Sequence, residues 1–288
     1  MASLRKSVLI TGCTDGGIGA ALAEVFHEKG YHVFATLRNL SKLPRTLSGA
    51  ANVTPLNLDV TSSESIAAAV ESVTKETDGR LDILVNNSGV NFPMPALDTP
   101  IAEAKALFDI NFWGALAMLQ AFAPLLIKAK GCLVNNASAN AISPMAFLST
   151  YNSSKAALAT GSETWRHELK PLGVRTLTLI TCAVRTHNHL KTPRLQVPET
   201  SHYYAIRDFI HSILDGRLQN NAITARQYAT KVVREIEKGS TGMVWVGTSA
   251  SLFHWVWWLS PKSIFDMVIE SVVPAQGEMA KVSGKKKA

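Results

Sequence analysis

The stretch Thr11 to Gly19 has the sequence TGCTDGGIG. It follows an apolar run, Ser7 to Thr11, and opens a helical pattern. Gly12 permits a tight turn, Gly17 lets main-chain amides approach a pyrophosphate, and Gly19 allows a helix to pack closely on the preceding strand. A glycine-rich turn of this kind also occurs without a ligand, so the stretch by itself predicts only a strand, a turn and a helix.

Outward from this loop, short β-branched runs alternate with helical stretches along most of the chain. Ile18, Leu22, Val25 and Phe26 repeat at helical spacing, and the pattern stops at Gly30. Strands that alternate with helices indicate parallel pairing and right-handed crossovers. We therefore expect an α/β fold: a single Rossmann-type doubly wound parallel sheet of about seven strands with helices on both faces. The expected strands are Ser7–Thr11, Tyr31–Thr36, Val53–Leu58, Leu81–Val85, Cys132–Asn135, Val174–Thr181 and Met243–Gly247.

Size and composition fit one globular domain spanning residues 1–288, because 47% of the residues are hydrophobic and 18% are charged. Three cysteines are too few for a disulfide framework or a zinc site, so we expect reduced thiols and no metal. The first apolar run is too short for a signal peptide, which favours an intracellular, cytoplasmic protein. Of the net charge of +7, Lys281, Lys285, Lys286 and Lys287 supply four. The nearly neutral body excludes a typical nucleic-acid surface.

The segment 187–227 departs from the alternation. It contains two prolines, several histidines and an aromatic group of Tyr203, Tyr204 and Phe209. We expect it to be an insertion that forms a substrate lid, with the aromatic residues as an apolar wall. His187 and His189 are candidates for contact with a polar substrate group.

The segment 249–288 begins with an apolar, aromatic stretch, Phe253 to Leu259, and ends in the basic tail. The stretch is expected to pack on the sheet, to form a dimer face, or to lie against a membrane or lipid-droplet surface, because Trp favours the headgroup level. The uncharged span from Gly239 to Pro261 is long enough to cross a bilayer. We do not expect it to do so, because it contains a strand.

The end of the second expected strand carries Arg38 and no acidic residue. An acidic residue there binds the adenosine ribose of NAD, whereas an arginine pairs with the 2′-phosphate of NADP(H). The position therefore favours NADP(H), the alternative being a solvated surface arginine. Asp59, which ends the third strand, is expected either to hold the adenine amino group or to cap the helix that starts near Ser62 or Ser63.

Tyr151 and Lys155 stand four positions apart, which places a phenol and an ammonium on one face of a helix. A phenol is a poor base at neutral pH, but a nearby cation favours the phenolate and lowers its pKa. Tyr151 then exchanges a proton with a carbonyl or alcohol oxygen during hydride transfer. Such pairs are also common on helix surfaces, so the assignment depends on the residues around them.

Other polar residues occur where this chemistry needs them. Ser138 follows the fifth strand, the motif Asn86-Asn87-Ser88-Gly89 ends the fourth, and Asn111 lies in the following helix. With the glycine loop and the Asp59-Val60 pair, this set resembles the short-chain dehydrogenase/reductase family over Ser7 to Thr186. The resemblance includes an Asn, Ser, Tyr, Lys tetrad in the family's order.

The resemblance implies a role for each member of the tetrad. Tyr151 is similar to the general acid that donates to the carbonyl oxygen, and Ser138 to the residue that orients the carbonyl. Lys155 is similar to the residue that holds the nicotinamide ribose and lowers the tyrosine pKa. Asn111 resembles the residue that positions a relay water, the alternative being an asparagine satisfied by main-chain groups. The implied coenzyme contacts are Ile10, Gly12, Gly17, Ile18, Gly19, Arg38, Asp59, Val60, Asn87, Gly89, Tyr151, Lys155, Val184 and Thr186.

Three features depart from the family's pattern. Thr181-Cys182 replaces the usual Pro-Gly after the sixth strand, the glycine loop has one extra residue, and Ser88 stands where alanine is usual. None of these changes removes a tetrad member. We interpret Cys13 and Cys182 as packing residues, because nothing near them in the sequence lowers a thiol pKa.

The sequences around Gly12, Asn111 and Thr186 resemble the acyl-dihydroxyacetone-phosphate reductase-like branch, which includes fungal biosynthetic members. This implies an NADPH-dependent oxidoreductase that reduces a ketone or aldehyde of a lipophilic (lipid-, polyketide- or terpenoid-like) substrate to an alcohol, or catalyses the reverse oxidation. The alternative is a redox-silent scaffold that acts as an isomerase, cyclase or binding protein. The family's helix pairing also implies a homo-oligomer, with Phe122, Leu125, Leu158 and Trp165 as either contact or core residues.

Overall fold

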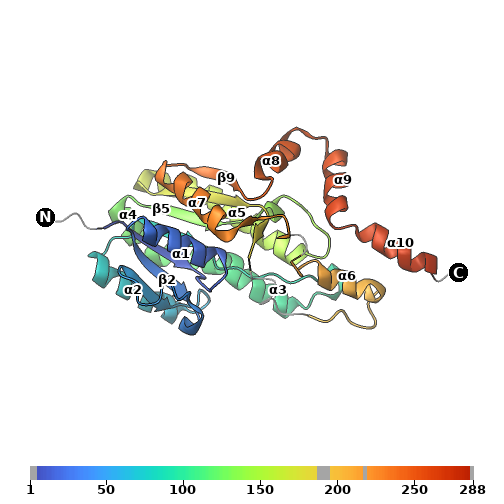
Figure 1. Cartoon of the computed structure of the whole chain (residues 1–288), viewed down its shortest axis with the longest axis horizontal. Helices are drawn as coiled ribbons and strands as arrows, with labels where there is room; N and C mark the ends of the chain where they lie inside the picture. Colours follow the sequence, from blue (N-terminus) through green and yellow to red (C-terminus); the bar gives the residue numbers. More distant parts are fainter. Residues whose placement is uncertain (1–4, 187–194, 217–218, 286–288) are drawn as a thin grey trace.

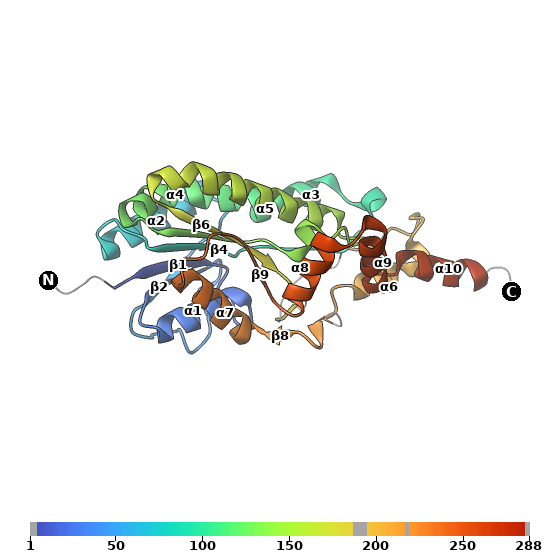
Figure 2. The same cartoon turned by 90° about the horizontal axis from the view of Figure 1, so that it is seen from above.

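The computed structural model describes residues 5–186, 195–216 and 219–285. The predicted lid residues His187 and His189 and the tail residues Lys286 and Lys287 lie outside these ranges. A central sheet is covered by helices on both faces, and three helices at the C-terminal end extend beyond it (Figures 1 and 2). The two ends of the described chain lie at opposite ends of the long axis of the molecule.

The main sheet has seven parallel strands in the order β3-β2-β1-β4-β5-β6-β9. This confirms the predicted fold, and the predicted strand ends differ from the observed ones by at most two residues. The strand order reverses between β1 and β4, so the crossovers diverge there and leave room for a ligand at the carboxyl ends. The strands are β1 Ser7–Thr11, β2 His32–Leu37, β3 Val53–Asn57, β4 Ile83–Asn86, β5 Cys132–Asn136, β6 Arg175–Thr181 and β9 Gly242–Val246.

Two groups of helices sandwich this sheet (Figure 2). One face is covered by α1 (Ile18–Glu28) and α7 (Ala225–Glu237), which enclose a core that includes Phe26, Tyr228 and Val232. The other face is covered by α2 (Ser63–Thr77), α4 (Gly114–Ala129) and α5 (Ser149–Leu169). Phe122, Leu125, Leu158 and Trp165 are all buried in this second core, so they are core residues rather than dimer contacts.

Capping residues fix where α2 and α7 begin. Ser62 accepts a hydrogen bond from the Ser65 amide and caps α2. Thr224 and Gln227 form a capping box at the start of α7. Helix α7 therefore begins at Ala225, within the last three residues of the predicted insertion.

The described part of the insertion packs over the carboxyl end of the sheet. Its base is closed by a short parallel pair, β7 (Val184–Arg185) with β8 (Ile223–Thr224). It also contains a 3₁₀ turn, η7 (Tyr204–Ile206), and helix α6 (Arg207–Ser212). The predicted aromatic wall is present in part, because the rings of Tyr203 and Phe209 both meet Phe147 edge to face.

The C-terminal segment forms α8 (Ala250–Leu259), α9 (Lys262–Val272) and α10 (Ala275–Lys285). Helix α8 holds no charged residue, and the side chains of Leu252, Trp255, Trp258 and Leu259 are at least half exposed. In the described part of the chain, one continuous helix, Ile101–Ala129, is long and apolar enough to cross a membrane. It comprises α3 (Ile101–Phe108), a π-helical turn and the core helix α4.

Candidate active site

The glycine loop adopts the conformation that its composition predicts. Gly12 has φ +79° and Gly16 has φ +70°, values that other residues rarely adopt. Gly17 is extended and precedes the first turn of α1, so the free amides of that turn face outward from the carboxyl end of β1. Gly16 was not among the predicted site residues, although two adjacent glycines in the loop were the signal for it.

Gly19 is the glycine of the loop with the least room for a side chain. A Cβ atom there would lie 2.5 Å from the Gly12 carbonyl oxygen and 2.6 Å from Asn87 Nδ2. Only glycine fits without moving the loop, which agrees with the close packing that the sequence predicts. Ile10 and Ile18, on either side of the loop, are buried or half-buried in the core beneath it.

Arg38 and Asp59 lie together beyond the ends of β2 and β3. The Arg38 side chain is exposed. The Asp59 carboxylate accepts hydrogen bonds from the Thr61 amide (3.0 Å) and hydroxyl (2.7 Å). The hydrogen bond from the Thr61 amide is the main reason why the Asp59 pKa lies below its usual value, and the Arg38 charge adds to the effect. The N-cap of α2 is Ser62, so the prediction that Asp59 could cap this helix was wrong. The Asp59 carboxylate instead stabilises the turn before the helix.

The side chain of Asn87 points back into the protein. Its Nδ2 donates to the main-chain oxygens of Thr11 (2.8 Å) and Gly12 (3.5 Å). Asn87 therefore ties the end of β4 to the glycine loop. Gly89, two residues on, lies beside Lys155, since a Cβ atom there would be 3.3 Å from Lys155 Nζ.

Asn111 lies in the π-helical turn, η3 (Asp109–Trp113), a feature that often marks functional sites. Its Oδ1 accepts from the Val90 amide (2.8 Å), and its Nδ2 donates to Val90 O (2.9 Å) and Ser154 Oγ (2.9 Å). The structure thus shows an asparagine whose side chain is satisfied locally. It holds the loop after β4 against α5, and its contact with a relay water stays a prediction.

Ser138, Tyr151 and Lys155 meet at the carboxyl ends of β5 and the start of α5. A hydrogen bond with Ser138 acts to lower the pKa of Tyr151, but burial outweighs it and raises that pKa. Lys155 Nζ lies 6.0 Å from the centre of the Tyr151 ring and donates to the Asn136 carbonyl (2.8 Å). The expected lowering of the Tyr151 pKa by Lys155 was therefore wrong for the protein alone, because the ammonium is remote and desolvation dominates. Tyr151 is a neutral acid.

Burial also affects the ammonium of Lys155, which is only 5% exposed. The loss of water lowers its pKa from 10.5 to about 8. The side chain is therefore still largely protonated at neutral pH, and it presents the main positive charge on this part of α5.

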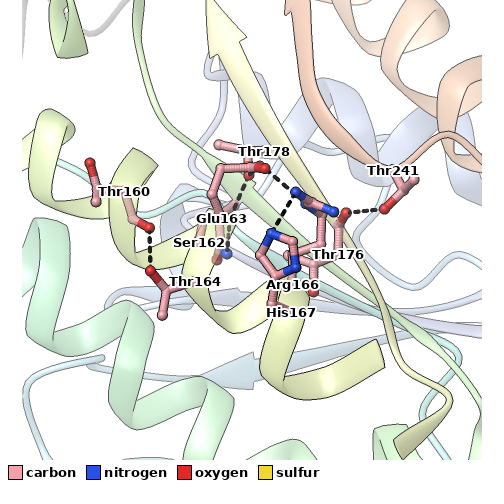
Figure 3. A network of polar contacts seen from close by, with 10 residues as sticks. Thr160, Ser162, Glu163, Thr164, Arg166, His167, Thr176, Thr178 and Thr241 are labelled. Carbon is pink, nitrogen blue, oxygen red and sulfur yellow. Dashed lines mark hydrogen bonds and ion pairs between the residues drawn. The ribbon is translucent and has the colours of Figure 1, made fainter. Parts of the chain in front are cut away.

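A row of polar side chains between α5 and the sheet holds the helix in place (Figure 3). Ser162 bonds the Thr178 hydroxyl (2.7 Å), which donates to Glu163 (2.6 Å), and Glu163 pairs with Arg166 (2.8 Å). Asn86 and Asn135 continue the row on the strand side, with 2.9 Å between them and 2.8 Å from Asn135 to Ser162. Asn86 was singled out only as part of the motif after the fourth strand, and the other residues were not predicted. The signal for them was a polar asparagine at the end of each of two neighbouring strands.

The remaining predicted positions lie nearby. Val60 and Val184 are buried, and the Thr186 amide donates to Gln219 Oε1 (3.1 Å). Burial raises the pKa of Cys13 to about 12 and that of Cys182 to about 11, so both side chains are protonated thiols at neutral pH. Among the described residues, no group of three or more His, Cys, Asp or Glu side chains could hold a metal ion.

Comparisons with known proteins agree with this geometry. The family model described as short chain dehydrogenase matches residues 6–194. A short-chain dehydrogenase of Penicillium ochrochloron is 44% identical over 265 residues, which cover 92% of this chain and 96% of that protein. The NADPH-dependent 1-acyldihydroxyacetone phosphate reductase of Schizosaccharomyces pombe is 41% identical over 210 residues, 72% of this chain and 70% of that protein. A short-chain dehydrogenase structure from Streptomyces avermitilis has a TM-score of 0.75 at 25% identity and covers 98% of both chains.

Proposed function

Because the chain belongs to the short-chain dehydrogenase family, we propose that it is an NADP(H)-dependent oxidoreductase that interconverts a lipophilic ketone or aldehyde and its alcohol. The observation that carries this proposal is the arrangement of three side chains. The phenol of Tyr151 is neutral and lies close enough to Ser138 for the serine hydroxyl to act on its pKa, and the buried ammonium of Lys155 lies one helical turn further along α5.

The residues around the carboxyl edge of the sheet fit a dinucleotide. Gly12, Gly16 and Gly17 leave the first turn of α1 open to a pyrophosphate, and Arg38 offers a guanidinium for a 2′-phosphate. Lys155 holds the nicotinamide ribose. Bound NADPH supplies the hydride in this reaction.

Tyr151 supplies the proton. In the direction of reduction, its hydroxyl donates to the carbonyl oxygen of the substrate while Ser138 donates a second hydrogen bond to the same oxygen. A phenol whose pKa is raised by burial keeps its proton until the oxygen becomes basic.

An apolar cluster beside Tyr151 supports a lipophilic substrate. It joins residues after β4 and β5 with the lid, and Tyr151 packs against it. Its buried members are Phe92, Met94, Leu107, Phe147, Leu148, Val197, Ile206, Ile210, Ile213 and Val273.

Coenzyme consumption tests this function against the redox-silent alternative. Oxidation of NADPH in the presence of long-chain ketones or aldehydes supports the oxidoreductase. Coenzyme binding without turnover over a broad set of such carbonyl compounds, in both reaction directions, supports a redox-silent scaffold.

Arg38→Ala is expected to weaken NADPH binding by about tenfold or more, because a charge-assisted pair with the 2′-phosphate is lost. NADH has no 2′-phosphate and serves as the control, so its affinity stays unchanged. Both dissociation constants are measured by energy transfer from tryptophan to the reduced nicotinamide. An equal loss for both coenzymes would contradict the assignment of Arg38.

Coenzyme affinity is expected to fall as the pH rises through about 8, the pKa of Lys155. Below that pH the side chain is an ammonium that donates to the ribose hydroxyls, and above it the charge is lost. Lys155→Met is expected to weaken binding about tenfold at pH 7 and to remove this pH dependence. Titrations of both proteins between pH 6.5 and 9.5, limits chosen to bracket the pKa by about 1.5 units, check the result.

The exposed side of α8 supports a second proposal, peripheral attachment to an anionic membrane surface. Its exposed Trp255 and Trp258 match the side chains that favour the headgroup level, and Lys281 lies in the same C-terminal segment. We also expect an intracellular protein that forms a homo-oligomer. A dimer face formed by α8 is the competing explanation for these aromatic side chains.

The double variant Trp255→Ala, Trp258→Ala is expected to lose most of its flotation with phosphatidylserine-containing vesicles. Trp113→Ala is the matched control, because Trp113 and Trp255 are each 54% exposed and Trp113 belongs to η3 rather than to α8. If the wild-type chain does not float, or the double variant floats equally well, the membrane proposal fails. A change in oligomeric state would then assign α8 to a dimer face.

A further inference from the structure

Four side chains form a row of hydrogen bonds across the carboxyl edge of the sheet. Tyr228 on α7 lies 2.6 Å from the Thr181 hydroxyl, which lies 2.5 Å from Asn136 Oδ1. Asn136 Nδ2 donates to Asn87 Oδ1 at 2.9 Å. Asn87 Nδ2 in turn donates to the main-chain oxygens of Thr11 and Gly12. The row thus connects α7, β6, β5 and β4 to the glycine loop.

The direction of every hydrogen bond in this row is determined by its last member. Main-chain carbonyls only accept, so Asn87 must donate through its amide nitrogen and accept through its oxygen. Asn136 must therefore donate to Asn87 and accept from Thr181. The Thr181 hydroxyl has one proton, which goes to Asn136. Tyr228 therefore does not accept from Thr181, and its own proton points toward the Thr181 hydroxyl at 2.6 Å and Asn136 Oδ1 at 3.4 Å.

Tyr228, at the start of the row, is a hydrogen-bond donor that does not lose its proton. Tyr228 is fully buried, and burial raises the pKa of its phenol, so the hydroxyl keeps its proton at any pH in the physiological range. Asn136 is 7% exposed. Inside the protein, water does not readily replace a partner that is removed, so each link depends on the previous one.

Asn136 also makes the contact that connects this row to the reaction site. Its main-chain oxygen accepts the hydrogen bond from Lys155 Nζ at 2.8 Å. Asn136 therefore binds two parts of the site. Its main-chain oxygen holds the Lys155 ammonium, and its side chain holds the glycine loop by way of Asn87. These are the two parts of the proposed site that would hold the nicotinamide ribose and the pyrophosphate of a dinucleotide.

We propose that Thr181 and Tyr228 are positioning residues, which hold Asn136 so that the Lys155 ammonium and the glycine loop keep the separation that the coenzyme requires. The inference rests on the proposed coenzyme function and assigns a role to the departure at Thr181. Proline, the usual residue of the family at this position, has no hydroxyl and cannot form the link.

The test compares variants of the full-length protein by NADPH titration, with thermal unfolding recorded for each. Thr181→Val removes the hydroxyl at nearly constant volume and is expected to weaken NADPH binding about fivefold. Thr181→Ser restores the hydroxyl and is expected to return the affinity to within about twofold of wild type. A role in packing alone would not be rescued by serine, which lacks the methyl group.

Thr176→Val is the matched control. Thr176 lies in the same strand and is fully buried, and its hydroxyl has no hydrogen-bond partner in the described structure. The dashed line from Thr241 in Figure 3 ends at the main-chain oxygen of Thr176. The same substitution there leaves NADPH affinity unchanged. Tyr228→Phe keeps the ring and removes the first donor, so it tests the row independently if Thr181→Val does not fold, and it is expected to weaken binding at least about twofold.

The outcomes separate this inference from the proposed function. If the wild-type protein binds NADPH and Thr181→Val and Tyr228→Phe bind it equally well, the positioning role is wrong and the coenzyme function stands. A loss that serine does not rescue also overturns the role. If the wild-type protein binds neither NADPH nor NADH, both proposals fail.

Discussion

Tyr151→Phe is expected to lower kcat by about 10³-fold, because general acid catalysis by a positioned side chain contributes on the order of 10² to 10⁴. The substitution removes one hydroxyl and leaves a ring of the same shape against the apolar cluster. Lys155 and the glycine loop are untouched, so the dissociation constant for NADPH should stay within about twofold of wild type. Steady-state turnover with a reactive lipophilic ketone and a coenzyme titration measure the two quantities.

Tyr31→Phe is the control for this experiment. Tyr31 is buried and its ring packs edge to face on Phe26, but it lies before β2, at the opposite edge of the sheet. Its replacement should leave kcat unchanged. A Tyr151→Phe protein that retains turnover would require another proton donor and would refute the assigned mechanism.

Gly19→Ala is expected to reduce turnover by about 10²-fold, because a shift of about 1 Å in a positioning element has that cost. The added Cβ would lie 2.5 Å from the Gly12 carbonyl, so the main chain of the loop must move. The same overpacking is expected to lower the free energy of unfolding by about 1 to 3 kcal/mol. Activity assays and urea unfolding measure both effects.

Gly277→Ala provides the comparison, because Gly277 is also in a helix but has only Pro274 Cβ near, at 3.9 Å. Alanine there should be neutral or stabilising by up to about 1 kcal/mol. Equal behaviour of the two variants would mean that the close approach at Gly19 is not what holds the loop.

The sequence predicts the sheet well because its signals are local. Each strand is a short apolar run, and the glycines of the loop indicate a turn directly. The seven strands were therefore expected within two residues of their observed ends. The predicted tetrad residues converge on one site for the same reason, since Tyr151 and Lys155 share a helix and Ser138 ends the neighbouring strand.

The remaining features depend on contacts between distant segments. The pKa of Tyr151 is set by burial, which no spacing of residues reveals. The link from Tyr228 to Asn136 joins residues 92 positions apart. In the sequence, Thr181 was notable only because it replaces the proline that is usual in the family. The partners of Asn111 are likewise visible only once the loop after β4 has been placed against α5.

The pairing of α1 with α7 has a consequence for how the chain folds during synthesis. Arg226 donates a hydrogen bond to Glu28, which lies 198 positions earlier in the chain. The buried side chains of α7 pack in the same core as Val8, Ile10 and Phe26. The first strands and α1 therefore leave the ribosome with their apolar face bare, and it stays bare until α7 and β9 emerge. Contacts this distant in sequence form slowly, and exposed apolar surface recruits chaperones or aggregates. Nascent chains that end before Ala225 are expected to need a chaperone, whereas chains that extend past Val246 are expected to release it.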